Sequence, residues 1–244
     1  MIRLNEQKFE SAVFGRVVAR LTIDADTPAS ALADMLEAAP EKWSTRDLWL
    51  VACRITRSDE SPAMAQSLEA AGFVAVETLV TLERKITPLP TEPDAAQPSR
   101  PGDAAPCVEI ARTAFTHDRF HADRRIPQTG ADELKARWVA NSFDGRADTV
   151  LVARKTNQHV GFCACLLDEQ RATIDLIATD RLAQGQGHGR RLVVGALQAY
   201  DGRAETMRVG TQASNERSLA LYRGLGFEEV SRADTYHWMS GGST

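Results

Sequence analysis

The chain has 244 residues, of which 43% are hydrophobic and 25% are charged, and its formal net charge is −4 at pH 7. A chain of this length is expected to form one large or two small domains, and its composition is typical of a soluble globular protein. The sequence has no basic block and no apolar run near the roughly 18 residues of a membrane span, which argues against nucleic-acid and membrane partners.

Four cysteines and the first few residues bear on the cellular compartment. Met1–Glu6 lacks the apolar core of a secretion signal. Cys163 and Cys165 alternate on one face of an expected strand, and they are better interpreted as small core residues than as half of a metal site. We therefore expect a cytoplasmic protein without a metal.

The first half alternates strand and helix patterns. Apolar residues that alternate with polar ones predict strands, and apolar residues at helical spacing predict helices. The expected elements are a strand at 16–24, a helix at 28–38, a strand at 47–55, a helix at 61–71 and a strand at 74–85. Gly72 is expected to end the second helix.

A proline-rich segment separates this half from the rest. Pro88, Pro90 and Pro93 can continue neither a strand nor a helix, which is typical of a linker. We expect an N-terminal αβ scaffold domain at 1–87, a linker at 88–94 and a second domain at 95–244. The second domain has the pattern of an α/β protein with a mixed sheet. Its helices are expected at 103–115, 131–143, 187–200 and 215–225, and its strands at 99–102, 148–155, 159–167, 171–179, 205–212 and 227–238.

A glycine-rich loop follows the apolar stretch 174–178 and leads into a helix. It reads Gln184, Gly185, Gln186, Gly187, His188, Gly189, Arg190 and Arg191. Backbone N–H groups at a helix start are unpaired and lie at the positive end of the helix dipole, so an anion can bind where glycines let the backbone approach. The spacing matches neither the dinucleotide fingerprint nor the NTP-binding loop. It favours a pyrophosphate site, with a flexible turn as the alternative and with His188 as a surface residue of the loop or helix.

A second motif lies about thirty residues further on. Asn215 precedes the helical run Leu219–Tyr222, and Gly226 and Phe227 follow it. Asn215 is a good helix N-cap. A tyrosine phenol, with an ordinary pKa of about 10, stays protonated at neutral pH and can act as a general acid, so Tyr222 is either an acid or a ring packed in the core.

Together the two motifs resemble the GNAT superfamily of acyl-CoA-dependent N-acetyltransferases. The segment 99–115 resembles the first strand and first helix of that superfamily. The segments 118–123 and 138–142 are more specific, and they resemble the TDP-fucosamine (4-amino-4,6-dideoxygalactose) acetyltransferase branch. The resemblance implies a GNAT fold for the second domain. The helix end and following strand at 68–76 resemble those at 222–230, although a helix end, a glycine and a strand are common to many αβ proteins. The first domain is therefore expected to be a smaller, degenerate GNAT-like domain, with Leu68 where the second has Tyr222.

The resemblance also implies a co-substrate, acetyl-CoA, and the residues that bind it. Those residues are Leu176, Ile177, Ala178, Gln184, Gly185, Gln186, Gly187, His188, Gly189, Arg190 and Asn215. The N–H of Ile177 or Ala178 would polarise the thioester carbonyl, and Tyr222 would protonate the departing thiolate. Asp175 lies on the same strand, but alternation places it on the face opposite Leu176, where a solvated or interface aspartate is favoured over a general base.

The acceptor is expected to lie beside the loop at 117–125, which is dense in hydrogen-bond donors. Arg119, Arg124 and Arg125 suit a diphosphate, and Phe120 suits stacking on a base or sugar. Asn141 completes the expected substrate-binding residues through the branch resemblance. The alternative is a solvated charged loop.

The sequence thus predicts acetyl transfer from acetyl-CoA to the amine of a nucleotide-linked amino sugar, of the TDP-4-amino-4,6-dideoxyhexose kind. Two alternatives stay open. One is acetylation of another amine, either an aminoglycoside-like molecule or a protein N-terminus. The other is a non-catalytic GNAT-like binding module. A homodimer is a candidate assembly.

Overall fold

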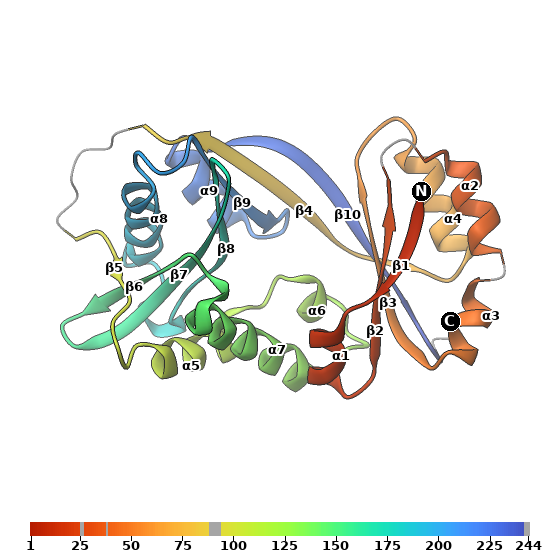
Figure 1. The fold of residues 1–244 in the computed structure, drawn as a ribbon, viewed down its shortest axis with the longest axis horizontal. Helices are drawn as coiled ribbons and strands as arrows, with labels where there is room; N and C mark the ends of the chain where they lie inside the picture. The colour runs from red at the N-terminus through yellow and green to blue at the C-terminus, as the bar shows by residue number, and fades with distance from the viewer. Residues whose placement is uncertain (25–26, 38, 88–93, 242–244) are drawn as a thin grey trace. The chain divides into compact units, whose positions relative to one another are not determined.

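A computed structural model describes residues 1–24, 27–37, 39–87 and 94–241 (Figure 1). The chain divides into two compact units. The first is Met1–Val80 with the stretch from Ser231 onward, and the second is Thr81–Val230. Two long strands, β4 (Val74–Lys85) and β10 (Glu228–Met239), each contribute to both units. The predicted linker at 88–94 lies outside the described residues except for Asp94, so that boundary stays a prediction.

The first unit is a sheet with helices packed on it. Its elements are β1 (Ile2–Glu6), α1 (Lys8–Phe14), β2 (Val17–Ile23), α2 (Ala29–Leu36), α3 (Ala39–Thr45), β3 (Leu48–Thr56) and α4 (Ser61–Ala70). The strands lie in the order β1-β2-β3-β10, and only β2 and β3 are parallel. Trp43 contributes to the core, where its ring lies 5.3 Å from Trp238 and 5.7 Å from Phe73.

The second unit begins with a short strand and three helices. They are β5 (Gln97–Pro98), α5 (Ala104–Ala114), α6 (Arg119–Ala122) and α7 (Gln128–Asn141), followed by a turn at Ser142–Arg146. Next come the antiparallel strands β6 (Thr149–Lys155), β7 (Gln158–Asp168) and β8 (Arg171–Thr179). After a 3-10 turn at Arg181–Ala183, the unit ends with α8 (His188–Ala199), β9 (Thr206–Gln212), α9 (Glu216–Gly224) and the start of β10.

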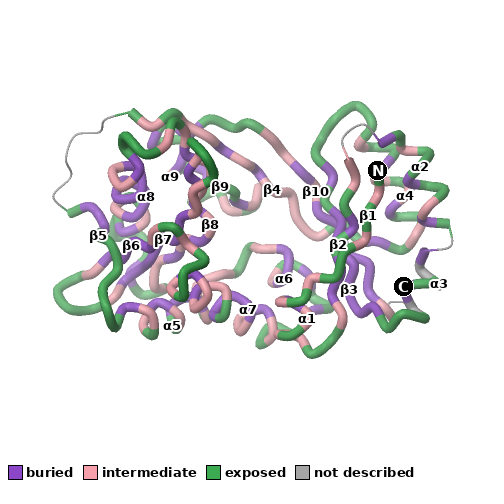
Figure 2. Tube along the Cα trace, viewed as in Figure 1, coloured by how far each residue is buried: buried purple, intermediate pink, exposed green. Residues whose placement is uncertain are grey.

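Helices cover both faces of this unit's sheet, whose strands lie in the order β4-β9-β8-β7-β6-β5. Phe162 of β7 belongs to a core cluster with residues of α5 and α7. Gly161, its neighbour, faces the other way, because a Cβ there would meet Leu192 of α8 at 3.0 Å. The strand β7 and the helix α8 are accordingly buried along most of their length (Figure 2).

The predicted helices and strands lie within three residues of their expected bounds, with one exception. The first strand of the second half forms at Gln97–Pro98, pairing with β6, and not at 99–102. Arg100–Gly102 instead makes a turn, since the Asp103 N–H donates to the Arg100 carbonyl and Gly102 has a φ of +93°. The sequence patterns did not predict β1, α1, α3 and α6. No helix of the described residues is long and apolar enough to cross a membrane.

The ends of α4 and α9 share one capping pattern. The Phe73 N–H donates to the Leu68 carbonyl, and the Phe227 N–H donates to the Tyr222 carbonyl, both at 3.0 Å. In each case the intervening glycine has a left-handed φ, which ends the helix without the strain that a Cβ would add. Leu68 therefore occupies in the first unit the place that Tyr222 occupies in the second. The pattern is common at helix ends, so it does not by itself show whether the two units have a common ancestor or only the same type of helix end.

Candidate active site

The parallel strands β8 and β9 separate part way along their length. Their last paired residues are Ile174 and Val209, yet β8 continues to Thr179 and β9 to Gln212. The far half of β8 therefore has an edge without a β9 partner. Such an edge can pair with an extended ligand, as an added strand would. Leu176 and Ala178 are buried and Ile177 is half-buried on this stretch, so all three predicted cofactor-binding residues of β8 lie at the separation.

A β-bulge interrupts β8 at the point where β9 departs. Ala164 of β7 pairs with Leu176, while Cys165 pairs with Ile174, so Asp175 is an extra residue. Simple alternation of side chains does not hold through a bulge, because the extra residue shifts the phase of the strand by one position.

The bulge decides where Asp175 points. Arg146 donates to both carboxylate oxygens of Asp175, at 2.5 and 3.2 Å. The neighbours of Arg146, Phe143 and Ala147, pack against the same core cluster that contains Leu176. The predicted placement of Asp175 on the face opposite Leu176 is therefore wrong. Its carboxylate is held in an ion pair, which fits the favoured structural role better than that of a free base.

The glycine loop opens onto an uncapped helix start. Gly185 and Gly187 have φ values of +76° and +84°, and a Cβ on either would meet no atom within 4 Å. Gly187 is the N-cap of α8, and no side chain accepts a hydrogen bond at that cap. The first N–H groups of α8 thus point out from a site kept free of side chains, as an anion site requires. Gly189 serves packing instead, since its Cβ would lie 3.3 Å from Leu221 of α9.

The loop itself contributes two glutamines and Arg190, and Lys155 contacts it from β6. Gln186 donates to the Leu182 carbonyl at 3.2 Å and accepts from Lys155 at 3.0 Å, so it shapes the loop. Gln184 and Arg190 are exposed. Lys155, at the end of β6, adds a positive charge that sequence reasoning missed, because nothing near it in the sequence connects it with a loop thirty residues away.

His188 is buried, which corrects its expected place on the surface. Only 3% of the residue is exposed, and within the described part of the chain neither ring nitrogen has a hydrogen-bond partner. Burial lowers the pKa of His188, and the charges of Arg191 and Lys155 lower it further. The helix start places this first residue of α8 against the sheet, where the imidazole is neutral at physiological pH.

Tyr222 lies in the last turn of α9 with only 2% of its surface exposed. Burial raises the pKa of its phenol, and the nearby thiols of Cys163 and Cys165 raise it further. These cysteines pair with Ile177 and Ile174, the residues on either side of the bulge. The phenol therefore lies near the place where β8 and β9 separate, and it stays protonated at neutral pH.

Asn215 caps the helix that carries this tyrosine. Its side-chain oxygen accepts a hydrogen bond from the Ser218 N–H at 3.3 Å. The N-cap interpretation is thereby confirmed. Its contact with the pantetheine arm stays a prediction.

The loop expected to bind the acceptor is more ordered than its charge suggests. Phe120 is only 1% exposed, and its ring lies 6.2 Å from Trp138, with the Arg119 guanidinium 4.4 Å over it. The ring therefore packs in the core and has no open face for a base or sugar. Arg125 forms a bidentate pair with Asp123, at 2.9 and 2.8 Å.

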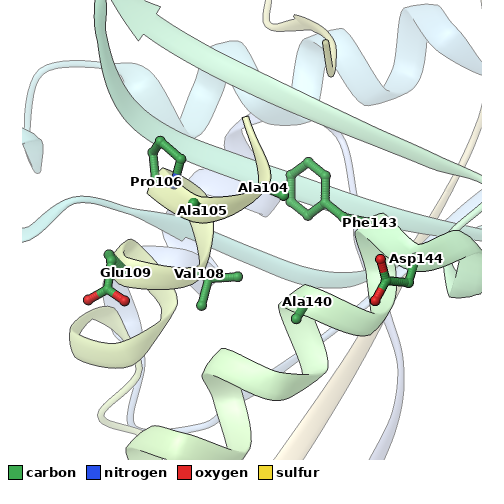
Figure 3. Close-up of a pocket in the computed structure, with 8 residues that line it drawn as sticks. All are labelled: Ala104, Ala105, Pro106, Val108, Glu109, Ala140, Phe143 and Asp144. Carbon is green, nitrogen blue, oxygen red and sulfur yellow. The ribbon is translucent and has the colours of Figure 1, made fainter. Parts of the chain in front are cut away.

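Of the remaining predicted acceptor residues, Arg124 is exposed, and Asn141 is half-buried at the end of α7. Asn141 lies next to Ala140, which lines a pocket of about 510 Å³ between α5 and the end of α7. Figure 3 shows Phe143 on one side of this pocket, Val108 of α5 on another, and Asp144 and Glu109 at its edges. The lining is mostly apolar, and none of the arginines of the 117–125 loop lines it.

A buried charged cluster holds the same loop to α7. His121 donates through Nδ1 to Asp118 at 2.5 Å and through Nε2 to Asp132 at 3.1 Å. Lys135 lies 3.6 Å from Asp118. An imidazole can donate from both nitrogens only when it is protonated, so His121 is a cation here. Sequence reasoning missed this cluster, because its members are spread over a loop and the following helix.

The model of the Acetyltransferase (GNAT) family matches residues 108–227. Over 141 residues the chain is 28% identical to the spore coat polysaccharide biosynthesis protein SpsD of Bacillus subtilis, covering 57% of this chain and 49% of that protein. Over 190 residues it is 28% identical to a mycothiol acetyltransferase of Kineococcus radiotolerans, covering 73% of this chain and 59% of that protein. The chain thus spans about half to three fifths of the length of these relatives.

Solved structures extend the likeness to the whole chain. A GCN5-related N-acetyltransferase from Sphaerobacter thermophilus superposes with a TM-score of 0.67, covering 98% of this chain and 76% of that one at 15% identity. At this identity the likeness shows the fold alone. The predicted GNAT fold, with its mixed sheet and flanking helices, is confirmed.

Proposed function

We propose, from the match of residues 108–227 to the model of the Acetyltransferase (GNAT) family, that this protein transfers the acetyl group of acetyl-CoA to an amine. One observation carries the proposal. The β8 residues beyond Ile174 have no β9 partner, the buried Tyr222 phenol lies near the cysteines that pair with this part of β8, and the chain leaves β8 through the glycine loop to the uncapped start of α8. A ligand with an extended arm, a thioester at one end of it and a pyrophosphate at the other matches that arrangement.

Each part of the site would have its own task. The N–H groups at the start of α8 would bind the pyrophosphate, with Lys155 adding charge. A backbone N–H of Ile177 or Ala178 would donate to the thioester carbonyl as negative charge develops on it, which is typically worth about 3–4 kcal/mol. Tyr222 would give its proton to the departing thiolate.

The proton of the amine needs a different acceptor. Asp175 is held by Arg146, and it would have to give up that ion pair to act as a base. We therefore propose that the amine loses its proton through water, without a dedicated side-chain base.

For the acceptor we propose a nucleotide-linked amino sugar. Three observations support it: the resemblance of segments 118–123 and 138–142 to the TDP-fucosamine branch, the similarity to a spore coat polysaccharide biosynthesis protein, and the exposure of Arg124 in the loop at 117–125. Of the three arginines, we propose Arg124 for the diphosphate contact, since Arg125 is paired with Asp123 and Arg119 lies over Phe120. Another amine is the alternative acceptor.

The test is mass spectrometry after incubation with acetyl-CoA and a panel of amines. The panel holds nucleotide-linked amino sugars, the same sugars without the nucleotide, an aminoglycoside and a peptide with a free N-terminus. A mass gain of one acetyl group on a nucleotide-linked sugar, absent with Tyr222→Phe, supports the proposal. Acetylation of another member alone would refute the acceptor assignment. Binding of acetyl-CoA without transfer to any member would favour a non-catalytic binding module.

A further inference from the structure

The last turn of α9 receives a donor from a distant strand. Carbonyl groups at a helix C-terminus have no partner within the helix and need one from outside. The Tyr222 carbonyl accepts from the Leu225 and Phe227 N–H groups, both at 3.0 Å. The carbonyl of Leu225, the C-cap residue of α9, accepts a hydrogen bond from the guanidinium of Arg84. Arg84 belongs to β4, more than one hundred residues earlier in the sequence.

Arg84 is also linked to the Tyr222 ring through one intermediate side chain. Its guanidinium carbon lies 6.0 Å from the centre of the Phe227 ring. The Phe227 ring lies 5.7 Å from the Tyr222 ring at an interplanar angle of 60°, an edge-to-face contact. One arginine therefore holds both the backbone turn that carries Tyr222 and the ring against which Tyr222 packs.

The end of β4 is itself fixed to the second unit. Glu83 pairs with Arg208 of β9 at 2.7 Å, and the Ile86 N–H donates to the Glu205 carbonyl at 2.8 Å. These contacts on either side of Arg84 belong to the same compact unit as α9. The guanidinium is thus presented from a strand held in place, and not from a loose chain end.

We propose that Arg84 is a positioning residue for Tyr222. A side chain from a strand that precedes the predicted linker then fixes the position of the general acid. The inference rests on the proposed function, because it assumes that Tyr222 is the acid. A guanidinium suits the task, because its planar fork can donate to a carbonyl while its face covers an aromatic ring. The positive charge also lies at the negative end of the α9 dipole. The ammonium of lysine is a point charge and would supply only part of this.

The test compares Arg84→Met and Arg84→Lys with a control in the same unit, Arg171→Gln. The control removes an exposed ion pair with Asp168 and leaves the Glu83–Arg208 pair that helps to fix Arg84 in place. Displacement of a catalytic group by about 1 Å can cost on the order of 100-fold in rate. We expect Arg84→Met to lower kcat about ten- to a hundredfold with little change in the KM for acetyl-CoA, Arg84→Lys to recover part of the loss, and the control to keep kcat. In a Tyr222→Phe background, Arg84→Met should lower kcat little further. An additive loss, or a loss equal to the control's, would overturn the inference.

A second measurement separates this inference from the proposed function. The chain has three tyrosines, so ring-labelled ¹³C-tyrosine gives three resonances, and Tyr222→Phe assigns one of them. We expect Arg84→Met to shift and broaden the Tyr222 resonance and Arg171→Gln to leave it in place. An unmoved Tyr222 resonance in Arg84→Met refutes the positioning role even if the enzyme is active. Absence of acetyl transfer in the wild type, with the resonance shifted as expected, refutes the function of Tyr222 and leaves the structural link.

Discussion

Replacing His121 with glutamine tests the buried charged cluster that holds α6 to α7. The histidine side chain is only 2% exposed, and it lies between the carboxylates of Asp118 and Asp132. Glutamine is neutral and can satisfy only one of them in the same way. Removing one partner of a buried ion pair typically costs about 3–5 kcal/mol, because the other charge stays buried. Lys135 remains 3.6 Å from Asp118, so we expect the lower end, about 3 kcal/mol.

The pKa of His121 determines how the loss of stability in His121→Gln should change with pH. Burial disfavours the charged imidazole, but the hydrogen bond and charge of Asp118, helped by Asp132, outweigh burial and raise the pKa of His121 above its usual range. A group whose pKa is raised on folding stabilises the protein below its unfolded pKa, about 6.5 for histidine, and loses that contribution as pH rises through the folded pKa. The difference in stability between wild type and variant should therefore be largest near pH 6 and shrink above the folded pKa.

The pKa of Asp118 sets the lowest pH at which the cluster stabilises the protein. Burial alone would raise its pKa, but Lys135 and His121 hold the pKa at about 2. Its contribution is present above the usual aspartate pKa of about 4 and is lost as pH falls toward 2. Urea unfolding followed by circular dichroism between pH 2 and 9 measures both limits.

The control for this experiment is Arg171→Gln, which removes an exposed pair with Asp168, itself 79% exposed. Exposed pairs contribute about 0–1 kcal/mol, so this variant should change stability little at any pH. A loss in His121→Gln no larger than the control's, or a loss that does not change between pH 6 and 9, would refute the protonated cluster.

Three further predictions concern the proposed chemistry. Tyr222→Phe should lower kcat by about 100- to 10,000-fold with little effect on acetyl-CoA binding. If kcat is unchanged while the chemical step limits the rate, Tyr222 is only a packed core residue. Gly187→Glu should abolish acetyl-CoA binding by calorimetry, whereas Gly202→Glu, at a similar φ of +72° against +84° but in another turn, should keep it. Arg124→Ala should raise the KM for the nucleotide sugar about tenfold to over a hundredfold, as loss of one charge-assisted contact implies. The KM for the free sugar should not change, and Arg137→Ala, an exposed arginine of α7, should affect neither.

Local patterns predicted the elements well, because their causes are local. The strand at 171–179 has the bounds that alternation predicts, and α8 begins one residue after the expected position. Gly72 ends α4 as expected, because a left-handed φ at that point favours glycine over other residues. Gly185 and Gly187 likewise have positive φ values, which glycine adopts without strain. In each case a short stretch of sequence contains the whole physical reason.

The side chains that the sequence misplaced depend on contacts from elsewhere in the chain. The surface interpretation of His188 failed, because the direction in which α8 leaves the loop buries its first residue. Phe120 follows a charged stretch, but Trp138 of α7 covers its ring. Arg84 gives no local sign of its link to α9, since its partner carbonyl belongs to Leu225. Polarity in a window predicts exposure only when no other element packs over that window.

The bulge at Asp175 lies in a strand that the local pattern predicted, but the pattern did not predict the bulge itself. Alternation identified β8 correctly and then misplaced one of its side chains, because one residue has no partner on β7. The same extra residue coincides with the end of pairing to β9, which stops at Ile174. A bulge increases local twist, and an increased twist turns the two parallel strands away from each other. The irregularity that defeats the sequence pattern is therefore also a physical reason for the open edge on which the proposed acetyl-CoA site depends, and the Arg146 ion pair to Asp175 helps to hold it.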